Sequence, residues 1–332
     1  MSQGTSKMLL AAGIFAGQCE IPRARQRTLE HRKPVVVGDI TVTPFPVDHS
    51  TFDCLALLIE ADGKRILYSG DLRMHGRKPG MAESLFQSLH GQPLDALIME
   101  GTHMGGHRER GPTEHQLEDD ILQHLHSAKD LVLAAFSPMH VDRLVSFYKA
   151  ARKAGRTFVV DVYGAFVLHL VSSQARIPRP TAENGIRVLY NQHFDQSWKR
   201  RRLDKIHRLF LADRIELSEI QAAPHSHVML FRPSMSRMDF GGVLPPALLL
   251  YSYWPGYLGN PDWVSTREQV ESAGGAMVEC HTSGHIYADD IVTFTQRLSP
   301  SRIIPIHTAS PDVFPSVCTN VVLLDDGKPF EV

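Results

Sequence analysis

Cysteine is sparse in this chain of 332 residues, which contains only Cys19, Cys54, Cys280 and Cys318. The four are widely separated, and no two of them form a CxxC pair. This spacing argues against a disulfide-stapled scaffold and against a zinc knuckle. It suits a reducing compartment, so we expect a cytoplasmic protein.

An excess of charge of one sign is also absent, because the net charge is -1. No global field therefore draws the protein to nucleic acid or to an anionic membrane, and any site for a polyanion must be a local patch. No apolar run approaches the ~20 residues needed to span a bilayer. The short run at residues 8–15 is better explained by an amphipathic helix capped by Thr5 or Ser6 than by a secretory signal.

The overall composition is that of an ordinary globular protein, with 43% hydrophobic and 21% charged residues. A chain of this length is expected to form two structural units rather than one. The pattern of elements predicts an α/β fold. Residues 34–49 and 54–71 each contain two β-branched or apolar runs around a turn, Gly38-Asp39 and Asp62-Gly63, which is typical of hairpins. From about residue 129 strands and helices alternate, which indicates a parallel sheet.

Polar residues that could form a site stand where predicted strands end. Because ligands of α/β folds bind at the carboxyl ends of strands, we expect these residues to share one edge. They are His49, Asp71, Glu100, Ser137, His285 and His307.

Three of these residues have side chains suited to a metal. Taken singly, His49 is better explained as a loop histidine and Asp71 as a turn cap than as metal ligands. Together with His307, they are typical ligands for Zn or Mn.

The segment from His281 to Thr308 combines a predicted strand end, a helix and a further strand. Ser283-Gly284-His285 is expected to open the helix, where backbone N–H groups could meet an anion. A histidine near a phosphate can protonate the leaving oxygen, and Glu100 could orient and charge His285 for that role.

Five strings in chain order resemble the motifs of the metallo-β-lactamase superfamily and, within it, the β-CASP nucleases such as ribonuclease J and the cleavage-and-polyadenylation endonuclease. The resemblance covers nearly the whole chain from about residue 36. The strings are PFPVDHS with His49, YSGDLRMHG with Asp71, IMEGTH with Glu100, HTSGH with His281 and His285, and IIPIHT with His307.

The resemblance implies an αββα sandwich with an inserted β-CASP domain. Residues 1–128 and 276–332 would form the metallo-β-lactamase domain, and residues 129–275 the insert. It implies two zinc ions, or Mn or Mg in their place, with His49 on one, His307 on the other and Asp71 bridging both. It also assigns His285, with Glu100, to protonation of the leaving oxygen.

One family motif is missing from the sequence. HxHxDH, which supplies four metal ligands, does not occur, and the nearest string, His225 to Met229, lacks the Asp-His pair. We expect Met1 to fall after that motif. Each of two metals would then have two protein ligands where a catalytic zinc has about three, so tight binding of two ions is not expected.

Candidate nucleic-acid contacts lie mainly in the predicted insert. The basic run from Trp198 to Arg208 could neutralise phosphates and stack on a base, or could be a solvated helix face. Further candidates for binding phosphate are His281, Ser283, Ser137, His140, Arg232 and Ser234.

These features together predict a metal-dependent hydrolase of β-CASP type that cleaves RNA, in a truncated form with an incomplete metal site. One alternative is a non-catalytic subunit that binds nucleic acid or a partner; another is a metallo-hydrolase of a small ester or amide. Single-stranded DNA is a second possible substrate. The Val-rich run at residues 33–45 is expected to leave an exposed sheet edge through which the chain self-associates.

Overall fold

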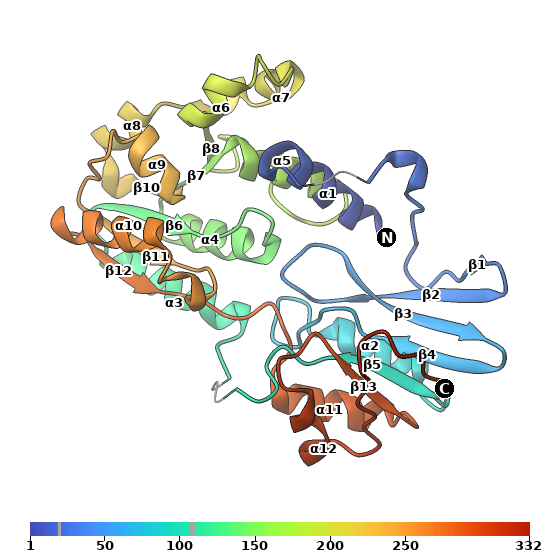
Figure 1. Ribbon diagram of the computed structural model, residues 1–332. Helices are drawn as coiled ribbons and strands as arrows, with labels where there is room; N and C mark the ends of the chain where they lie inside the picture. The colour runs from blue at the N-terminus through green and yellow to red at the C-terminus, as the bar shows by residue number, and fades with distance from the viewer. Residues whose placement is uncertain (19–20, 107–109) are drawn as a thin grey trace. The chain divides into compact units, whose positions relative to one another are not determined.

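The computed structural model describes residues 1–18, 21–106 and 110–332, so Cys19 lies outside the described part. The chain divides into two compact units. Unit 1 comprises residues 1–9, 19–111 and 283–332, and unit 2 comprises residues 10–18 and 112–282. The structure is a mixed α/β fold with one sheet in each unit (Figure 1). In the described part of the chain, no helix has the length and apolar character to cross a membrane.

Unit 1 contains a six-stranded sheet in the order β1-β2-β3-β4-β5-β13. The first four strands pair antiparallel, and β4, β5 and β13 are parallel. The strands are β1 (Val35–Val37), β2 (Ile40–Val47), β3 (Cys54–Ala61), β4 (Lys64–Tyr68), β5 (Ala96–Glu100) and β13 (Ile303–Ile306). The helices are α2 (Gly80–Leu89), α11 (Ala288–Leu298) and α12 (Phe314–Val317).

Both predicted hairpins of unit 1 are confirmed. Val37 pairs with Ile40 around Gly38, whose φ of 61° matches a two-residue turn with glycine first. Ala61 pairs with Lys64 around Asp62 and Gly63, which both have positive φ, as a type I′ turn requires.

The core of unit 1 lies on one face of its sheet. Phe45, Leu58 and Leu97 point from the strands into it, and α2 and α11 cover it. Phe86 of α2 and Phe294 of α11 pack with ring centroids 5.1 Å apart. This packing fixes β5 and β13 side by side, and with them the loops that follow each strand.

Helix α1 (Gln3–Ala16) begins three residues earlier than a cap at Thr5 would place it. The hydroxyl of Ser2, rather than that of Thr5 or Ser6, accepts a bond from the backbone N–H of Thr5 and caps the helix. The expected apolar face is present, since Met8 and Ala12 are both buried.

Unit 2 contains seven parallel strands in the order β12-β11-β6-β10-β7-β8-β9. They are β6 (Leu131–Ala135), β7 (Thr157–Asp161), β8 (Ile186–Leu189), β9 (Arg214–Ile215), β10 (His227–Leu230), β11 (Ala247–Tyr251) and β12 (Ala276–Glu279). The helices are α3 (Glu114–Ser127), α4 (Val141–Lys153), α5 (Val162–Val171), α6 (Gln192–Ser197), α7 (Asp204–Leu209), α8 (Leu217–Ala222), α9 (Pro233–Met238) and α10 (Pro261–Ser272).

The strand order of unit 2 reverses between β6 and β10. The connection from β6 runs past β10 to β7, whereas the connection from β10 runs past β6 to β11. Ligands of open parallel sheets bind where such a reversal opens a crevice beyond the strand ends. Ser137 and His140 follow β6, and Arg232 and Ser234 follow β10, so all four flank this point.

Candidate metal centre

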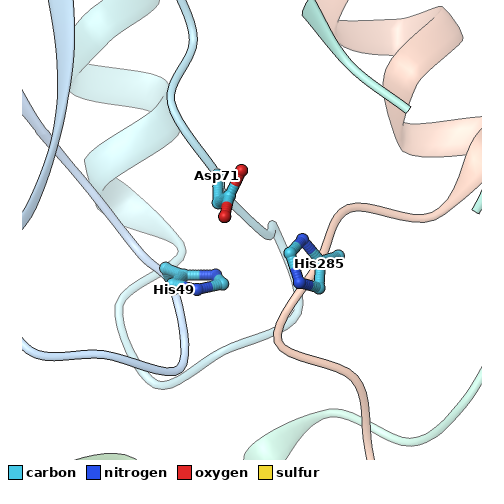
Figure 2. A group of neighbouring side chains, drawn as sticks. All are labelled: His49, Asp71 and His285. Atoms are coloured by element: carbon cyan, nitrogen blue, oxygen red, sulfur yellow. The ribbon is translucent and has the colours of Figure 1, made fainter. Parts of the chain in front are cut away.

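Five predicted site residues form a contiguous cluster in unit 1. His49 follows β2, Asp71 follows β4, and Glu100 ends β5; His285 precedes α11, and His307 follows β13. A ligand atom from each of His49, Asp71 and His285 lies within 4.8 Å of the others, and the same holds for Glu100, His285 and His307. Figure 2 shows His49, Asp71 and His285 extending from three separate loops toward a common space. His285 is the member that the two groups share.

His49 is held by the loop that carries His285. Its Nδ1 atom lies 2.7 Å from the carbonyl oxygen of Gly284, and its Nε2 atom lies 3.2 Å from the hydroxyl of Ser50. A carbonyl oxygen can only accept, so Nδ1 carries the proton and Nε2 has the lone pair. Burial, followed by the nearby charge of His285, lowers the pKa of His49, which favours the neutral imidazole that a metal requires.

His285 is bound to a fully buried carboxylate. Its Nδ1 atom lies 3.2 Å and 3.3 Å from the two carboxylate oxygens of Glu100 and 3.2 Å from the hydroxyl of Thr102. Glu100 also accepts a bond from the backbone N–H of Leu72.

The opposite charges of Glu100 and His285 stabilise each other and offset the unfavourable effect of burial on each charged form. Burial on its own lowers the pKa of His285, but the hydrogen bond and charge of Glu100, with the charge of Asp71, raise it above its usual value. Burial likewise raises the pKa of Glu100, but its bonds to His285, Leu72 and Thr102 lower it overall. The pair therefore favours an ionised carboxylate beside an imidazole that can hold a proton near neutral pH.

His307 and Asp71 form a second, more exposed pair. Nδ1 of His307 lies 2.9 Å from Oδ1 of Asp71, and their side chains are 53% and 39% exposed. The backbone of His307 has a φ of 48°, a left-handed conformation that residues other than glycine seldom adopt. Such local strain occurs often at functional sites, because surrounding contacts must maintain it.

The donor atoms fit one divalent cation. Histidines that bind metals usually donate their other ring N–H to a carboxylate or a carbonyl, as His49 does to Gly284 and His285 to Glu100. Two imidazoles and one carboxylate match a catalytic zinc site with three protein ligands, and they also suit Mn. In the described residues, His49, Asp71 and His307 do not form such a group by themselves.

Ser283 precedes His285 by two positions, and its hydroxyl and its carbonyl oxygen already form hydrogen bonds within unit 1. Its hydroxyl accepts from the backbone N–H of His285 and is 2.7 Å from Nε2 of His103. Its carbonyl oxygen accepts from Arg73 and His75. The expected helix start at Ser283 is wrong, because α11 begins only at Ala288.

The remaining predicted phosphate-binding residues belong to unit 2. His281 Nδ1 lies 3.0 Å from the carbonyl oxygen of Ser252, His140 Nε2 lies 3.3 Å from a carboxylate oxygen of Glu114, and the hydroxyl of Ser137 accepts from Met139. Arg232 forms an ion pair of 2.6 Å with Asp161 and lies over the ring of Tyr163. Ser234 is exposed in the first turn of α9.

The basic run of unit 2 is not one continuous helix face. Lys199, Arg200 and Arg202 are exposed on the turn between α6 and α7. Trp198 stacks on His207 with ring centroids 4.0 Å apart.

Sequence reasoning missed three buried residues behind the site: Arg73, His75 and His103. All three contact Ser283, which no periodicity could reveal because 180 positions separate His103 from it. A usable signal was their position directly after strand ends, beside Asp71 and Glu100.

No family model matches the sequence, and no curated protein matches it. Among solved structures, 92 chains match. One is a protein of unknown function from Enterococcus faecalis V583, with a TM-score of 0.75 and 21% sequence identity over 98% of this chain and 74% of that one. The two proteins therefore share a fold.

Proposed function

We propose that the chain is a hydrolase of the metallo-β-lactamase superfamily, of β-CASP type, in which the single sheet of unit 1 corresponds to part of the αββα sandwich and unit 2 interrupts it. We further propose that it holds one divalent cation on His49, Asp71 and His285 and that its substrate is RNA. The observation that carries this proposal is the shared arrangement of His49 and His285. Each has Nδ1 bonded to an acceptor, and a ligand atom of each lies within 4.8 Å of one from Asp71.

The chain's own residues supply binding and proton handling. A divalent cation, preferably Zn and otherwise Mn or Mg, would act as a Lewis acid toward a phosphoryl oxygen. Glu100 fixes the ring of His285 and its tautomer. In the cation-free protein this imidazole can hold a proton, whereas with a divalent cation bound it would serve as one of the ligands. His307, half-exposed beside Asp71, is then positioned to give a proton to the leaving oxygen.

The substrate proposal is supported by unit 2. An overall charge of -1 gives no general attraction for RNA, so binding must depend on local features. The exposed basic turn between α6 and α7 can neutralise phosphates. Ser137, His140, Arg232 and Ser234 flank the point where the sheet order reverses.

Two measurements test the proposal. Titration of the cation-free chain with Zn²⁺ should show one tight site that Asp71→Ala abolishes. The loaded chain, in excess over 5′-labelled RNA, should then cleave it slowly, and Asp71→Ala should not. Absence of a tight site would overturn the cation assignment. Tight cation and RNA binding without cleavage would favour a non-catalytic nucleic-acid-binding protein, and cleavage of a small ester alone would exclude RNA.

A further inference from the structure

Arg73 lies where three loops of unit 1 meet. Its side chain is buried, with only 1% of the residue exposed. Its backbone N–H donates to the carbonyl oxygen of Asp48 at 2.7 Å, and its Nε donates to Oδ1 of Asp48 at 3.0 Å. Its Nη1 donates to the carbonyl oxygen of Ser283 at 3.2 Å. One residue thus binds the loop that precedes His49 and the loop that precedes His285, and it follows Asp71 by two positions.

Asp48 completes this connection and is itself buried. Its Oδ1 accepts from Arg73 and its Oδ2 from the backbone N–H of Lys78 at 2.8 Å. Removal of one member of a buried ion pair leaves the other charge without compensation, so the pair must be kept or removed together.

Gly76 shows how closely the pair is packed. A Cβ atom at this position would lie 2.4 Å from both carboxylate oxygens of Asp48 and 2.5 Å from Nε of Arg73. Any side chain at Gly76 would therefore force the two charged groups to move. Gly76→Ala disturbs the pair without a change of charge.

The loop that carries His285 is held from a second side. Nε2 of His75 lies 2.9 Å from the carbonyl oxygen of Ser283, and Nε2 of His103 lies 2.7 Å from its hydroxyl. The same hydroxyl accepts from the backbone N–H of His285 at 3.1 Å. The backbone at Ser283 is thereby fixed, and Arg73 joins it to the loop of His49.

We propose that Arg73, through its pair with Asp48, is a positioning residue that holds His49, Asp71 and His285 in place for a divalent cation. This inference rests on the cation-binding part of the proposed function, not on RNA cleavage. A guanidinium has several donors in a fixed plane and can bind Asp48 and Ser283 together. A lysine ammonium at this position could not span both acceptors in the same way.

The test compares Arg73→Met, Arg73→Lys and Gly76→Ala with the unaltered chain. Isothermal titration with Zn²⁺ alone should show affinity lowered by about 10–100-fold, the usual effect of removing a group that supports a metal ligand. Hydrogen exchange without metal should become faster at residues 47–50 and 283–285 together. Arg156→Met is the control, because Arg156 is also a buried arginine but donates to the carbonyl oxygens of Ala128 and Asp130 in unit 2. It should lower stability and leave Zn²⁺ affinity unchanged.

A double variant separates the effect of Arg73 on the position of the metal ligands from its effect on the stability of the fold. Asp48→Asn with Arg73→Met removes both buried charges, and it should regain stability relative to Arg73→Met while Zn²⁺ affinity stays low. Unchanged Zn²⁺ affinity in a folded Arg73 variant would overturn the inference, and Gly76→Ala decides the matter if the Arg73 variants do not fold. If the unaltered chain binds no Zn²⁺, the proposed function fails. In that case hydrogen exchange still tests the role of Arg73. Unchanged protection of residues 47–50 or of residues 283–285 in the Arg73 variants would refute that role.

Discussion

Nδ1 of His285 lies 3.2 Å from one oxygen and 3.3 Å from the other oxygen of the Glu100 carboxylate, which has no exposed surface. A buried carboxylate has few other ways to be compensated, so the ring is held in one orientation with Nε2 directed away from Glu100. This bond fixes the residue that links the two candidate ligand groups, since both groups contain His285.

We predict that Glu100→Gln lowers Zn²⁺ affinity about 10–100-fold, because the amide still accepts a hydrogen bond but removes the charge that makes His285 a strong ligand. Titration calorimetry of the variant measures the change. His285→Ala should lower the affinity further. Unchanged affinity in His285→Ala, together with abolished cleavage, would instead identify His285 as a proton donor only.

RNA turnover by this chain should be slow. A second cation in such sites contributes several kcal/mol to the transition state, so its absence corresponds to roughly a thousandfold below the ~10 s⁻¹ that is typical of enzymes. Single-turnover cleavage of labelled RNA with saturating Zn²⁺ or Mn²⁺ measures the rate. Fast turnover that Asp71→Ala abolishes would mean that a second cation is bound by residues not considered above.

The basic turn between α6 and α7 should contribute to RNA binding through charge. Arg200→Ser should weaken binding of a single-stranded RNA and reduce the slope of log K against log salt by about 0.7 for each phosphate that is no longer neutralised. Filter binding at several salt concentrations gives this slope. Arg267→Ser on α10, also an exposed arginine, is the control and should leave it unchanged. An equal effect from both substitutions would argue against a local site.

Acid should destabilise unit 2 through His227 in β10. Burial lowers the pKa of His227 despite its bond to the carbonyl oxygen of Ala223. The unfolded chain therefore binds this proton more readily, so stability is complete above about pH 6.5 and decreases as the pH falls toward the folded pKa. His227→Gln should reduce the decrease between pH 7.5 and pH 5, as measured by denaturant midpoints. His126→Gln, at an exposed position near the end of α3, should not reduce it.

Self-association through β1 remains a prediction. Val36 and Val37 are 64% and 54% exposed, and in the described sheet β1 has a neighbour on one side only. Two copies of β1 could pair antiparallel about Val36, which places Lys33 of one copy opposite Asp39 of the other. Sedimentation at tens of micromolar should show concentration-dependent association that Val36→Lys prevents.

Charge reversal distinguishes this pairing from non-specific aggregation. Lys33→Glu and Asp39→Lys should each weaken association, and the double variant should restore it. A well-behaved monomer at tens of micromolar would show that the edge is not used.

The sequence predicted the strands and hairpins well because their signals are local. Gly38-Asp39 and Asp62-Gly63 specify their turns through residues that accept positive φ, and the apolar alternation around them sets the strands. The residues of the cluster were likewise identifiable, since each lies at the end of a strand or in the loop that follows one.

Two kinds of feature could not be read from local patterns. The helix expected at Ser283 begins at Ala288, because the carbonyl oxygen of Ser283 is instead bound by Arg73 and His75, and its hydroxyl by His103. The shared role of His285 also depends on long-range geometry. Glu100 approaches it from the end of β5, and His49 and His307 approach it from two other loops; no spacing in the sequence encodes those distances.

The bonds that close the cluster join residues very far apart in the chain. His49 and Gly284 are 235 positions apart, and Asp71 and His307 are 236 apart. At about 5–20 residues per second, a ribosome releases the later partner roughly 12 to 47 seconds after the earlier one. Residues 112–282 of unit 2 are synthesised in that interval. The cation site therefore cannot close before residues 284–307 have been synthesised, and the nascent chain must keep His49 and Asp71 soluble without these partners until then.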